Sequence, residues 1–389
     1  MSQRLRQSIF LGWITLFLGI MATRLPIQPA VATPLQAALP PAPGRIQVSA
    51  WMPTSWDGAS AWASFRAHAA QLDAVSPFWY EAGADGALLP LKGARDETLL
   101  QEARFAGARV IPTISNHYDG NRIHTILTDE TLAEAHRQAI INEVTLFDYD
   151  GIDLDYEGLL ADDRDLFSAW VHTLADELHR NNKALTITVQ PKTFDADGWN
   201  GPGAQDYRAL ASAADELRIM TYGWCWQTGC VDSAPPGPIA PIHWMRRVID
   251  YAKTQASPQK LVLGVHLYGY DWWEENKRLF LPLELADMTG QALVWEQAEA
   301  LHQEYDAELR WWESDDWGPV REPWFTYDEG AHVVVFANAD SVAARAQLAA
   351  EEGLRGIILW RLGGEDPMLW RRLPTRSYRN FLPIMRPTD

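Results

Sequence analysis

Short apolar segments alternate with amphipathic segments along most of the chain. Runs rich in β-branched and aromatic residues, typical of buried strands, occupy residues 45–51, 72–80, 109–116, 150–157, 185–190, 217–222, 261–270 and 356–360. Between several of these runs, apolar residues recur at helical spacing, which predicts helices over residues 59–70, 98–107, 131–146 and 164–181. Strand and helix repeating at this interval indicate a parallel sheet with covering helices. Eight such strands predict an α/β fold, a (β/α)8 TIM barrel.

The interval between the seventh and eighth predicted strands is unusually long. It contains about 85 residues, far more than a loop and one helix require. Strand character recurs within it, at residues 309–312, 323–327 and 332–336, and residues 294–301 have helical character. The sequence therefore predicts a small α+β insertion at about residues 272–338 of a domain that spans residues 45–389.

The first 44 residues differ in composition from the rest. Arg4 and Arg6 precede an apolar run at residues 9–21, and small residues at 30–32 suit a cleavage site. This order predicts a secretory signal over residues 1–32, and the apolar run is short for a membrane span. An uncleaved anchor is the alternative. Residues 33–44 contain four prolines and indicate an extended linker.

Composition and charge narrow the class of partner. The chain has 389 residues, of which 47% are hydrophobic and 22% charged, as in ordinary globular proteins. Residues 1–32 hold three arginines and no acidic residue, so their removal takes the formal charge from −18 to −21. This charge argues against nucleic acid and against an anionic membrane surface as partners. It does not discriminate among neutral polysaccharides. We expect a monomer, although the sequence leaves the oligomeric state open.

Cys225 and Cys230 are the only cysteines. In an exported protein, a pair so close in sequence predicts a disulfide that closes a small loop. Two free buried thiols are the alternative. A metal site is not indicated, because no second Cys/His pair accompanies them.

Residues 150–157 read Asp-Gly-Ile-Asp-Leu-Asp-Tyr-Glu and carry the most distinctive pattern in the chain. On an extended strand, Asp153, Asp155 and Glu157 project from one face, about 7 Å apart, and the apolar residues between them face the other way. Like charges that face a protein interior are costly unless the acids share protons, bind metal or find donors. The pattern therefore calls for a specific function.

Three interpretations of this row differ in what surrounds it. A solvated edge strand does not suit the apolar opposite face, which needs burial. A calcium-binding loop is disfavoured because Gly151 and Glu157 fall in the wrong register for an EF-hand. A carboxylate relay that ends in a general acid fits best, since catalytic groups collect at the carboxyl ends of the strands in a parallel barrel.

The octet resembles the D-G-x-D-x-D-x-E signature of glycoside hydrolase family 18, the chitinase family, and every fixed position is present. The string Ser-Pro-Phe-Trp-Tyr at residues 76–80 resembles the spore-germination or cortex-lytic branch of that family. Residues 220–222 resemble its Met-x-Tyr-Asp strand, with Gly223 where the Asp is usual. The resemblance implies a barrel whose insertion forms one wall of a cleft.

The resemblance also implies roles for individual residues in a substrate-assisted mechanism, in which the substrate's own N-acetyl carbonyl acts as nucleophile. Glu157 would be the general acid and later the base. Asp155 would bind the acetamido N–H, and Asp153 would share a proton with Asp155. Tyr222 would donate to the acetamido oxygen, and Trp360 would form the floor on which the sugar stacks.

Further substrate contacts are expected at strand ends, from Gln190, Asn116, Tyr268 and Trp79. Loop capping is an equal alternative for the two amides. Tyr222 or Trp360, taken alone, would fit a core aromatic residue better than a site residue. Gly223 puts substrate preference and turnover in question, but not the identity of the acid.

These observations predict an exported glycoside hydrolase, secreted, periplasmic or held in the cell envelope. It would cleave β-linked polysaccharide that contains N-acetylglucosamine, either peptidoglycan or a related cell-wall glycan, with retention of configuration. No metal or organic cofactor is implied, and no membrane association after signal cleavage. The alternatives are a chitinase or chitooligosaccharide hydrolase, and a non-catalytic chitinase-like glycan-binding protein. The presence of Glu157 argues against the last.

Overall fold

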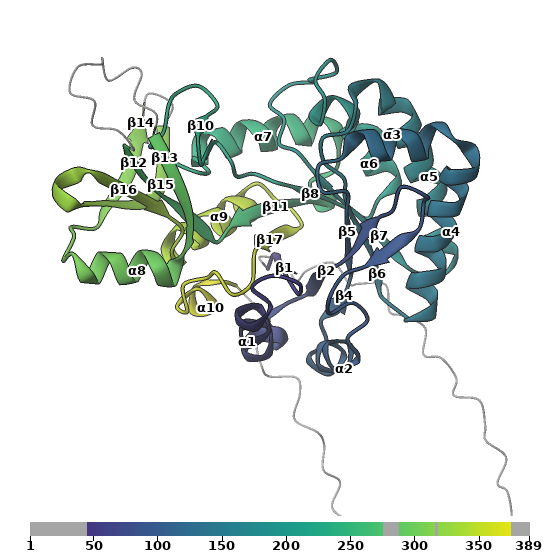
Figure 1. Ribbon diagram of the computed structural model, residues 1–389, viewed down its shortest axis with the longest axis horizontal. Coiled ribbons are helices and arrows are strands. Elements are labelled where there is room, and N and C mark those ends of the chain that lie inside the picture. The colour runs from purple at the N-terminus through teal and green to yellow at the C-terminus, as the bar shows by residue number, and fades with distance from the viewer. Residues whose placement is uncertain (1–44, 275–287, 316–317, 375–389) are drawn as a thin grey trace, which may run out of the picture. The chain divides into compact units, whose positions relative to one another are not determined.

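The computed structural model describes residues 45–274, 288–315 and 318–374 (Figure 1). The predicted signal segment 1–32 and the predicted linker 33–44 lie outside the described residues. Within the described ranges, no helix is both long enough and apolar enough to cross a membrane.

Eight parallel strands close into a barrel, as predicted. Their order around the barrel is β1-β17-β11-β8-β7-β6-β5-β2, and pairing of β1 with β2 completes the ring. The strands are β1 (Gln47–Met52), β2 (Ala74–Ala82), β5 (Thr113–Ser115), β6 (Gly151–Asp155), β7 (Ala184–Val189), β8 (Glu216–Ile219), β11 (Leu261–His266) and β17 (Gly356–Trp360). Two short strands, β3 (Leu88–Pro90) and β4 (Arg109–Val110), also pair with β2.

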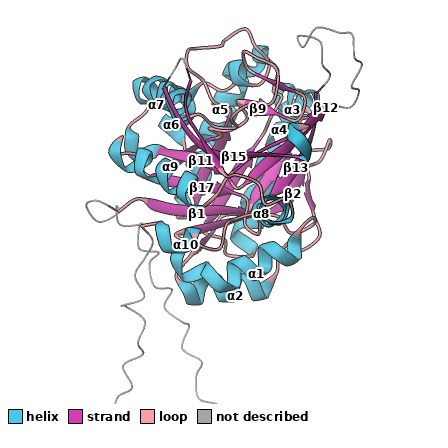
Figure 2. Cartoon of the chain, turned by 90° about the vertical axis from the view of Figure 1, so that its left-hand side faces the viewer, coloured by secondary structure: helices cyan, strands magenta, loops and turns pink. Residues whose placement is uncertain are grey.

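Helices cover the outside of the barrel (Figure 2). They are α1 (Gly58–His68), α2 (Glu97–Ala106), α3 (Gly120–Thr128), α4 (Glu130–Leu146), α5 (Arg164–Arg180), α6 (Tyr207–Ala213), α7 (Ile242–Gln255), α9 (Ala339–Glu351) and α10 (Leu369–Arg372). Aspartates define the starts of four helices, because their side chains accept hydrogen bonds from the first-turn N–H groups. These are Asp96, Asp119, Asp129 and Asp206.

The main apolar core lies between the barrel wall and the helices, and the barrel strands also carry many buried polar residues beside a small apolar cluster of Trp51, Phe78, Val262 and Ile358. The helix α5 illustrates the outer layer, with its buried apolar stripe from Phe167 to Leu178. The buried polar residues carried by the barrel strands include Gln47, Ser49, Ser76, Thr113, Asp153, Thr186, Thr188, Glu216 and Arg218. Several of these polar side chains hydrogen-bond one another, as Gln47 does with Glu216 and Arg218 with Ser76, and these bonds hold the side chains beneath the acidic row.

The insertion between β11 and β17 forms a second, antiparallel sheet in the order β13-β12-β16-β15-β14. Its strands are β12 (Tyr268–Glu274), β13 (Met288–Val294), β14 (Arg310–Asp315), β15 (Gly318–Tyr327) and β16 (His332–Phe336), and α8 (Trp295–Glu304) follows β13. The predicted seventh strand, residues 261–270, is therefore two strands. Its second part leaves the barrel at Tyr268 because that segment pairs with β13 and β16.

Candidate active site

A cavity of about 700 Å³ lies where the barrel strands end, and the insertion forms part of its wall. Ala292, Leu293 and Glu296 line it from β13 and α8, so the insertion borders the site. The predicted site residues among its lining are Asp155, Glu157, Tyr222, Tyr268 and Trp360. The remaining predicted ones, Asp153, Asn116, Gln190 and Trp79, are not among the described lining residues.

Asp153 lies inside the barrel with both carboxylate oxygens surrounded by donors. It is fully buried on β6. Its hydrogen-bond and ion-pair partners are Trp51 Nε1 (3.0 Å), Thr113 Oγ1 (3.0 Å), Thr186 Oγ1 (2.7 Å), Thr188 Oγ1 (3.3 Å) and Arg218 Nη1 (3.4 Å). They come from β1, β5, β7 and β8, so closure of the barrel builds this shell. The sharing of a proton with Asp155 stays a prediction.

Asp155 is buried but incompletely hydrogen-bonded. Its side chain lines the cavity, and none of the described residues donates a hydrogen bond to its Oδ1. Burial raises the pKa of Asp155 well above its usual range, and the negative charges of Glu157 and Asp153 raise it further. An acceptor oxygen of Asp155 is therefore left for a ligand.

The main chain of Glu157 is clamped by Asn116. The Asn116 Nδ2 donates to the Glu157 carbonyl at 2.7 Å, and the Glu157 N–H donates to Asn116 Oδ1 at 2.9 Å. Asn116 is fully buried. Both ends of its amide are thus used to hold Glu157, which is the kind of contact that loop capping would make. A contact of Asn116 with sugar stays a prediction.

The carboxyl group of Glu157 has two side-chain partners, Tyr118 and Gln190. Burial raises the pKa of Glu157, and these two hydrogen bonds oppose the rise because they stabilise the charged form. Gln190 thus lies on the acid itself and not on the cavity lining. Gly201 makes this position available, since a Cβ there would lie 2.4 Å from Gln190 Oε1.

Tyr118 was not predicted from the sequence as a site residue. It lies on the loop after β5, lines the cavity and has a left-handed backbone with φ of 60°. Two glycines let this loop approach Glu157: a Cβ on Gly120 would lie 1.9 Å from the Gly158 carbonyl oxygen, and one on Gly158 would lie 2.8 Å from the Tyr118 carbonyl oxygen. The sequence offered one signal for Tyr118: it is an aromatic residue just past β5, the strand that pairs with the acidic strand β6.

Tyr222 faces the same cavity from the loop after β8. Burial raises the pKa of its hydroxyl well above the usual range, and the nearby Tyr268, Asp155 and Glu157 raise it further. The hydroxyl therefore remains a hydrogen-bond donor. Gly223 has a left-handed φ of 84°, and a Cβ there would meet nothing within 4 Å. The space next to Tyr222 is therefore open where the family resemblance led us to expect an Asp side chain.

Trp360 belongs to an aromatic cluster at the base of the cavity. Its ring lies edge-on to Trp51 and Phe78, at centroid distances of 5.8 and 5.2 Å. Trp79, the next residue on β2, points to the opposite side, is fully buried and lies 5.6 Å from the ring of Tyr149. Strand alternation thus turns Phe78 toward Trp360 and Trp79 toward the core, and a contact of Trp79 with substrate stays a prediction.

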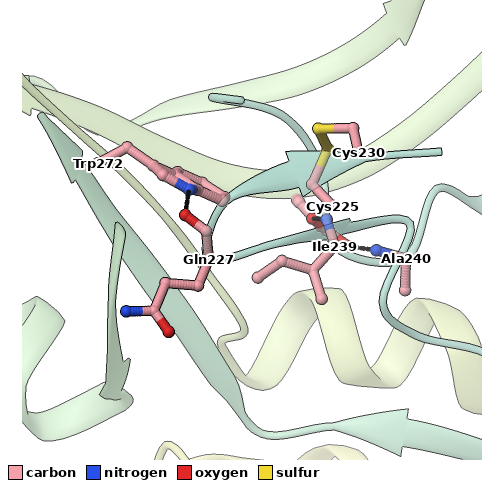
Figure 3. Close-up of a disulfide and its surroundings, with 7 residues drawn as sticks. Cys225, Gln227, Cys230, Ile239, Ala240 and Trp272 are labelled. Carbon is pink, nitrogen blue, oxygen red and sulfur yellow. Dashed lines mark hydrogen bonds between the residues drawn. A yellow bond between two sulfur atoms is a disulfide. The ribbon is translucent and has the colours of Figure 1, made fainter. Parts of the chain in front are cut away.

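A disulfide joins Cys225 to Cys230 in the hairpin of β9 (Cys225–Trp226) and β10 (Gly229–Cys230), just after Tyr222 (Figure 3). The insertion contacts this hairpin through Trp272, whose Nε1 donates to the Gln227 carbonyl at 3.2 Å. The hairpin therefore links the end of β8 to the insertion sheet on one side of the cavity.

Residues 91–365 match the family model of glycosyl hydrolases family 18. Barrel, insertion and acidic strand agree with that match. The chain belongs to glycoside hydrolase family 18 and is a glycosidase.

The relatives include two groups that are named for different activities. A cortical fragment-lytic enzyme of Bacillus anthracis is 30% identical over 301 residues, which cover 76% of this chain and 66% of the relative. The chain thus spans about two thirds of that relative's length. The di-N-acetylchitobiase of Homo sapiens is 27% identical over 236 residues, covering 54% of this chain and 57% of that enzyme.

Solved structures show the same two groups. The spore cortex-lytic enzyme SleL of Bacillus cereus is similar with a TM-score of 0.73 and 26% identity, over 84% of this chain and 73% of that one. A chitinase of Chromobacterium violaceum is similar with a TM-score of 0.71 and 26% identity, over 84% of this chain and 98% of that one.

Proposed function

We propose that this glycosidase cleaves β-linked N-acetylglucosamine-containing glycan of the bacterial cell wall by substrate-assisted, retaining catalysis. Glu157 protonates the leaving oxygen and later activates water. Asp155 binds the acetamido N–H and stabilises the charge of the cyclised intermediate, while Tyr222 donates to the acetamido oxygen. The reacting sugar stacks on Trp360.

The observation that carries this proposal is the incomplete hydrogen bonding of Asp155. A buried carboxyl oxygen without a partner is costly, and none of the described residues donates to Oδ1 of Asp155, a residue that lines the cavity together with Glu157. An acetamido N–H would satisfy it. A plain glucose residue has no N–H to offer, so the site favours an N-acetylated sugar.

Two other carboxylates line the cavity and deserve comparison as enzyme nucleophiles. Asp57 accepts a hydrogen bond from Arg361, so it is already engaged in an ion pair. Glu296 lies in the first turn of α8, on the insertion. Neither belongs to the acidic row. In a substrate-assisted mechanism, neither carboxylate is needed for the bond-breaking step.

The choice of cell-wall glycan over chitin rests on relatives. A cortical fragment-lytic enzyme is 30% identical over 301 residues, whereas the chitobiase is 27% identical over 236 residues; the solved cortex-lytic enzyme and the chitinase are each 26% identical. Chitin oligomers remain the second candidate substrate, supported by these two relatives. Product analysis on purified peptidoglycan and on chitin oligomers, side by side, distinguishes the two.

The proposal includes export. It is supported by the basic and apolar pattern of residues 1–32, and a disulfide such as Cys225–Cys230 suits an oxidising compartment.

Replacement of the acid tests the proposal. Glu157→Gln keeps the shape of the side chain but cannot donate the acid proton, so turnover should fall by about 10²–10⁴-fold while glycan binding persists. Glu296→Gln and Asp57→Asn serve as matched controls and should keep hydrolysis. If Glu157→Gln stayed within a few-fold of wild type, or if Glu296→Gln alone abolished turnover, the assignment of the acid would be wrong.

A further inference from the structure

Glu322 lies on β15 of the insertion and is fully buried. Its carboxyl group accepts hydrogen bonds from two successive main-chain groups: the Ile239 N–H donates to Oε2 at 2.6 Å and the Ala240 N–H donates to Oε1 at 2.7 Å. Both residues lie near the disulfide hairpin, on the chain segment that leads into α7 (Figure 3). A side chain of the insertion thus holds the main chain of a loop that belongs to the barrel.

Arg345 on α9 completes this contact and is also fully buried. Its Nη2 donates to Glu322 Oε1 and to the Ala240 carbonyl, both at 2.6 Å. Its Nη1 donates to the Arg321 carbonyl at 3.1 Å. Glu322 and Arg345 together therefore satisfy the N–H and the carbonyl of Ala240, and polar groups buried in this way are costly to leave unpaired.

The main chain held by Glu322 in turn holds the residues that follow Tyr222. The Trp224 N–H donates to the Ile239 carbonyl at 2.8 Å. Ile239 is therefore bonded through its N–H to Glu322 and through its carbonyl to Trp224. Only Gly223 separates Trp224 from Tyr222. A short path of hydrogen bonds thus connects the insertion to a residue that lines the cavity.

Gly223 makes this path important for Tyr222. Glycine restricts the main chain less than any other residue, and nothing lies within 4 Å of the place where a Cβ of Gly223 would be. The ring of Tyr222 contacts Tyr268 edge-on, with centroids 6.2 Å apart. On the C-terminal side of Tyr222, the main chain depends on the bond from Trp224 to Ile239.

We propose that Glu322 is a positioning residue of this active site: from the insertion, its carboxyl group fixes the main chain at residues 239–240 and, through Trp224, the place of the Tyr222 hydroxyl. The proposal rests on the proposed role of Tyr222 as donor to the acetamido oxygen. Glu322 is not among the described residues that line the cavity, so it acts through Tyr222 and not on the substrate. The insertion then braces a donor of the site in addition to forming part of its wall.

A double-mutant cycle separates this role from a general structural one. In Glu322→Gln the side chain keeps its shape, but its Nε2 cannot accept, so one of the two N–H groups at residues 239–240 loses its partner. The Tyr222 hydroxyl should shift, and kcat should fall by about tenfold. In a Tyr222→Phe background the same substitution should lower kcat by less than about threefold, because the hydroxyl that Glu322 positions is already absent.

Hydrogen exchange of main-chain amides in the full chain tests the first step without needing turnover. We expect the Trp224 N–H to exchange at least about tenfold faster in Glu322→Gln, because the carbonyl that it binds is no longer fixed. The double variant Glu322→Gln/Arg345→Met also removes the buried cation that the single variant leaves unpaired. It should fold even if the single variant does not, and it should show the same faster exchange.

Glu143 on α4 provides the matched control. It is also buried, and it pairs with an arginine, Arg95, at 2.6 Å. Glu143→Gln should therefore lower stability, as Glu322→Gln does, but it should leave both kcat and the exchange of the Trp224 N–H at their wild-type values.

The proposal is wrong if the Trp224 N–H exchanges at the wild-type rate in both variants of Glu322. It is also wrong if Glu322→Gln lowers kcat by the same factor with and without the Tyr222 hydroxyl. Failure of the proposed function looks different: the wild type would not cleave N-acetylglucosamine oligomers, or Tyr222→Phe would keep full turnover. The exchange result would then still decide whether Glu322 fixes this segment.

Discussion

The clamp of Asn116 on Glu157 makes a quantitative prediction about both stability and turnover. Asn116→Ala removes two hydrogen bonds, of 2.7 and 2.9 Å, and leaves the N–H and the carbonyl of Glu157 without these partners. Asn116→Asp is the more selective change. The carboxylate can still accept from the Glu157 N–H, but it cannot donate to the carbonyl and repels it.

The magnitude follows from the cost of unpaired polar groups. Each buried group left unsatisfied costs about 1–3 kcal/mol, so Asn116→Ala, which leaves two such groups, should lower the free energy of unfolding by about 2–6 kcal/mol. The acid also loses its fixed position. A misplacement of about 1 Å can cost 10²-fold in rate, so kcat should fall by roughly that factor while KM changes less. Asn116→Asp should show at least half the loss of stability.

Urea unfolding and steady-state hydrolysis of an N-acetylglucosamine oligomer measure the two effects. Asn121, exposed on α3, provides the matched control, and Asn121→Ala should change the free energy of unfolding by less than about 0.5 kcal/mol. If Asn116→Ala matched this control in stability and kept kcat within threefold of wild type, the clamp would not position the acid.

Three further variants test separate parts of the site. Tyr118→Phe removes a donor to the charged form of Glu157, so the pKa of Glu157 should rise. The basic limb of the kcat/KM profile should therefore move to a pH higher by roughly half a unit. A limb that stayed in place or moved to lower pH would contradict this contact. Asp155→Asn should lower turnover more than it weakens binding of an oligomer, as measured by kinetics and calorimetry; equal losses would argue against a role in the transition state. Replacing Cys225 and Cys230 together by serine should lower the free energy of unfolding by about 2 kcal/mol, measured by denaturation with the reduced wild type as control. If wild type and variant were equally stable under oxidising conditions, the disulfide would have no stabilising role.

The fold and the acidic row were predictable because they depend on periodicity. Alternation along β6 determines that Asp153 and Asp155 share a face, and helical spacing indicates which residues pack on the barrel. The strand ends at Asp155, earlier than predicted, so Glu157 lies just beyond it, where Asn116 holds its main chain. Strand ends were less predictable. At residues 261–270 one apolar run became two strands, because the second part pairs within the insertion, a contact between segments far apart in sequence.

The surroundings of the acids could not be predicted from local pattern. Trp79 and Phe78 are adjacent aromatic residues, and only the register of β2 in the closed barrel decides which of them packs against Trp360. Arg218 looks like an ordinary charged residue within an apolar run, yet barrel closure buries it beside Asp153. Tyr118 reaches Glu157 through a left-handed loop and glycine contacts that no periodicity encodes.

The anomeric configuration of the first product tests the central claim most directly. Proton NMR of freshly cleaved N-acetylglucosamine oligomer, recorded before mutarotation, reports which anomer the enzyme releases. Substrate-assisted catalysis with Glu157 as acid and Asp155 at the acetamido group predicts the β-anomer, with configuration retained. Release of the α-anomer, or efficient cleavage of a substrate whose reacting sugar lacks the N-acetyl group, would contradict the account.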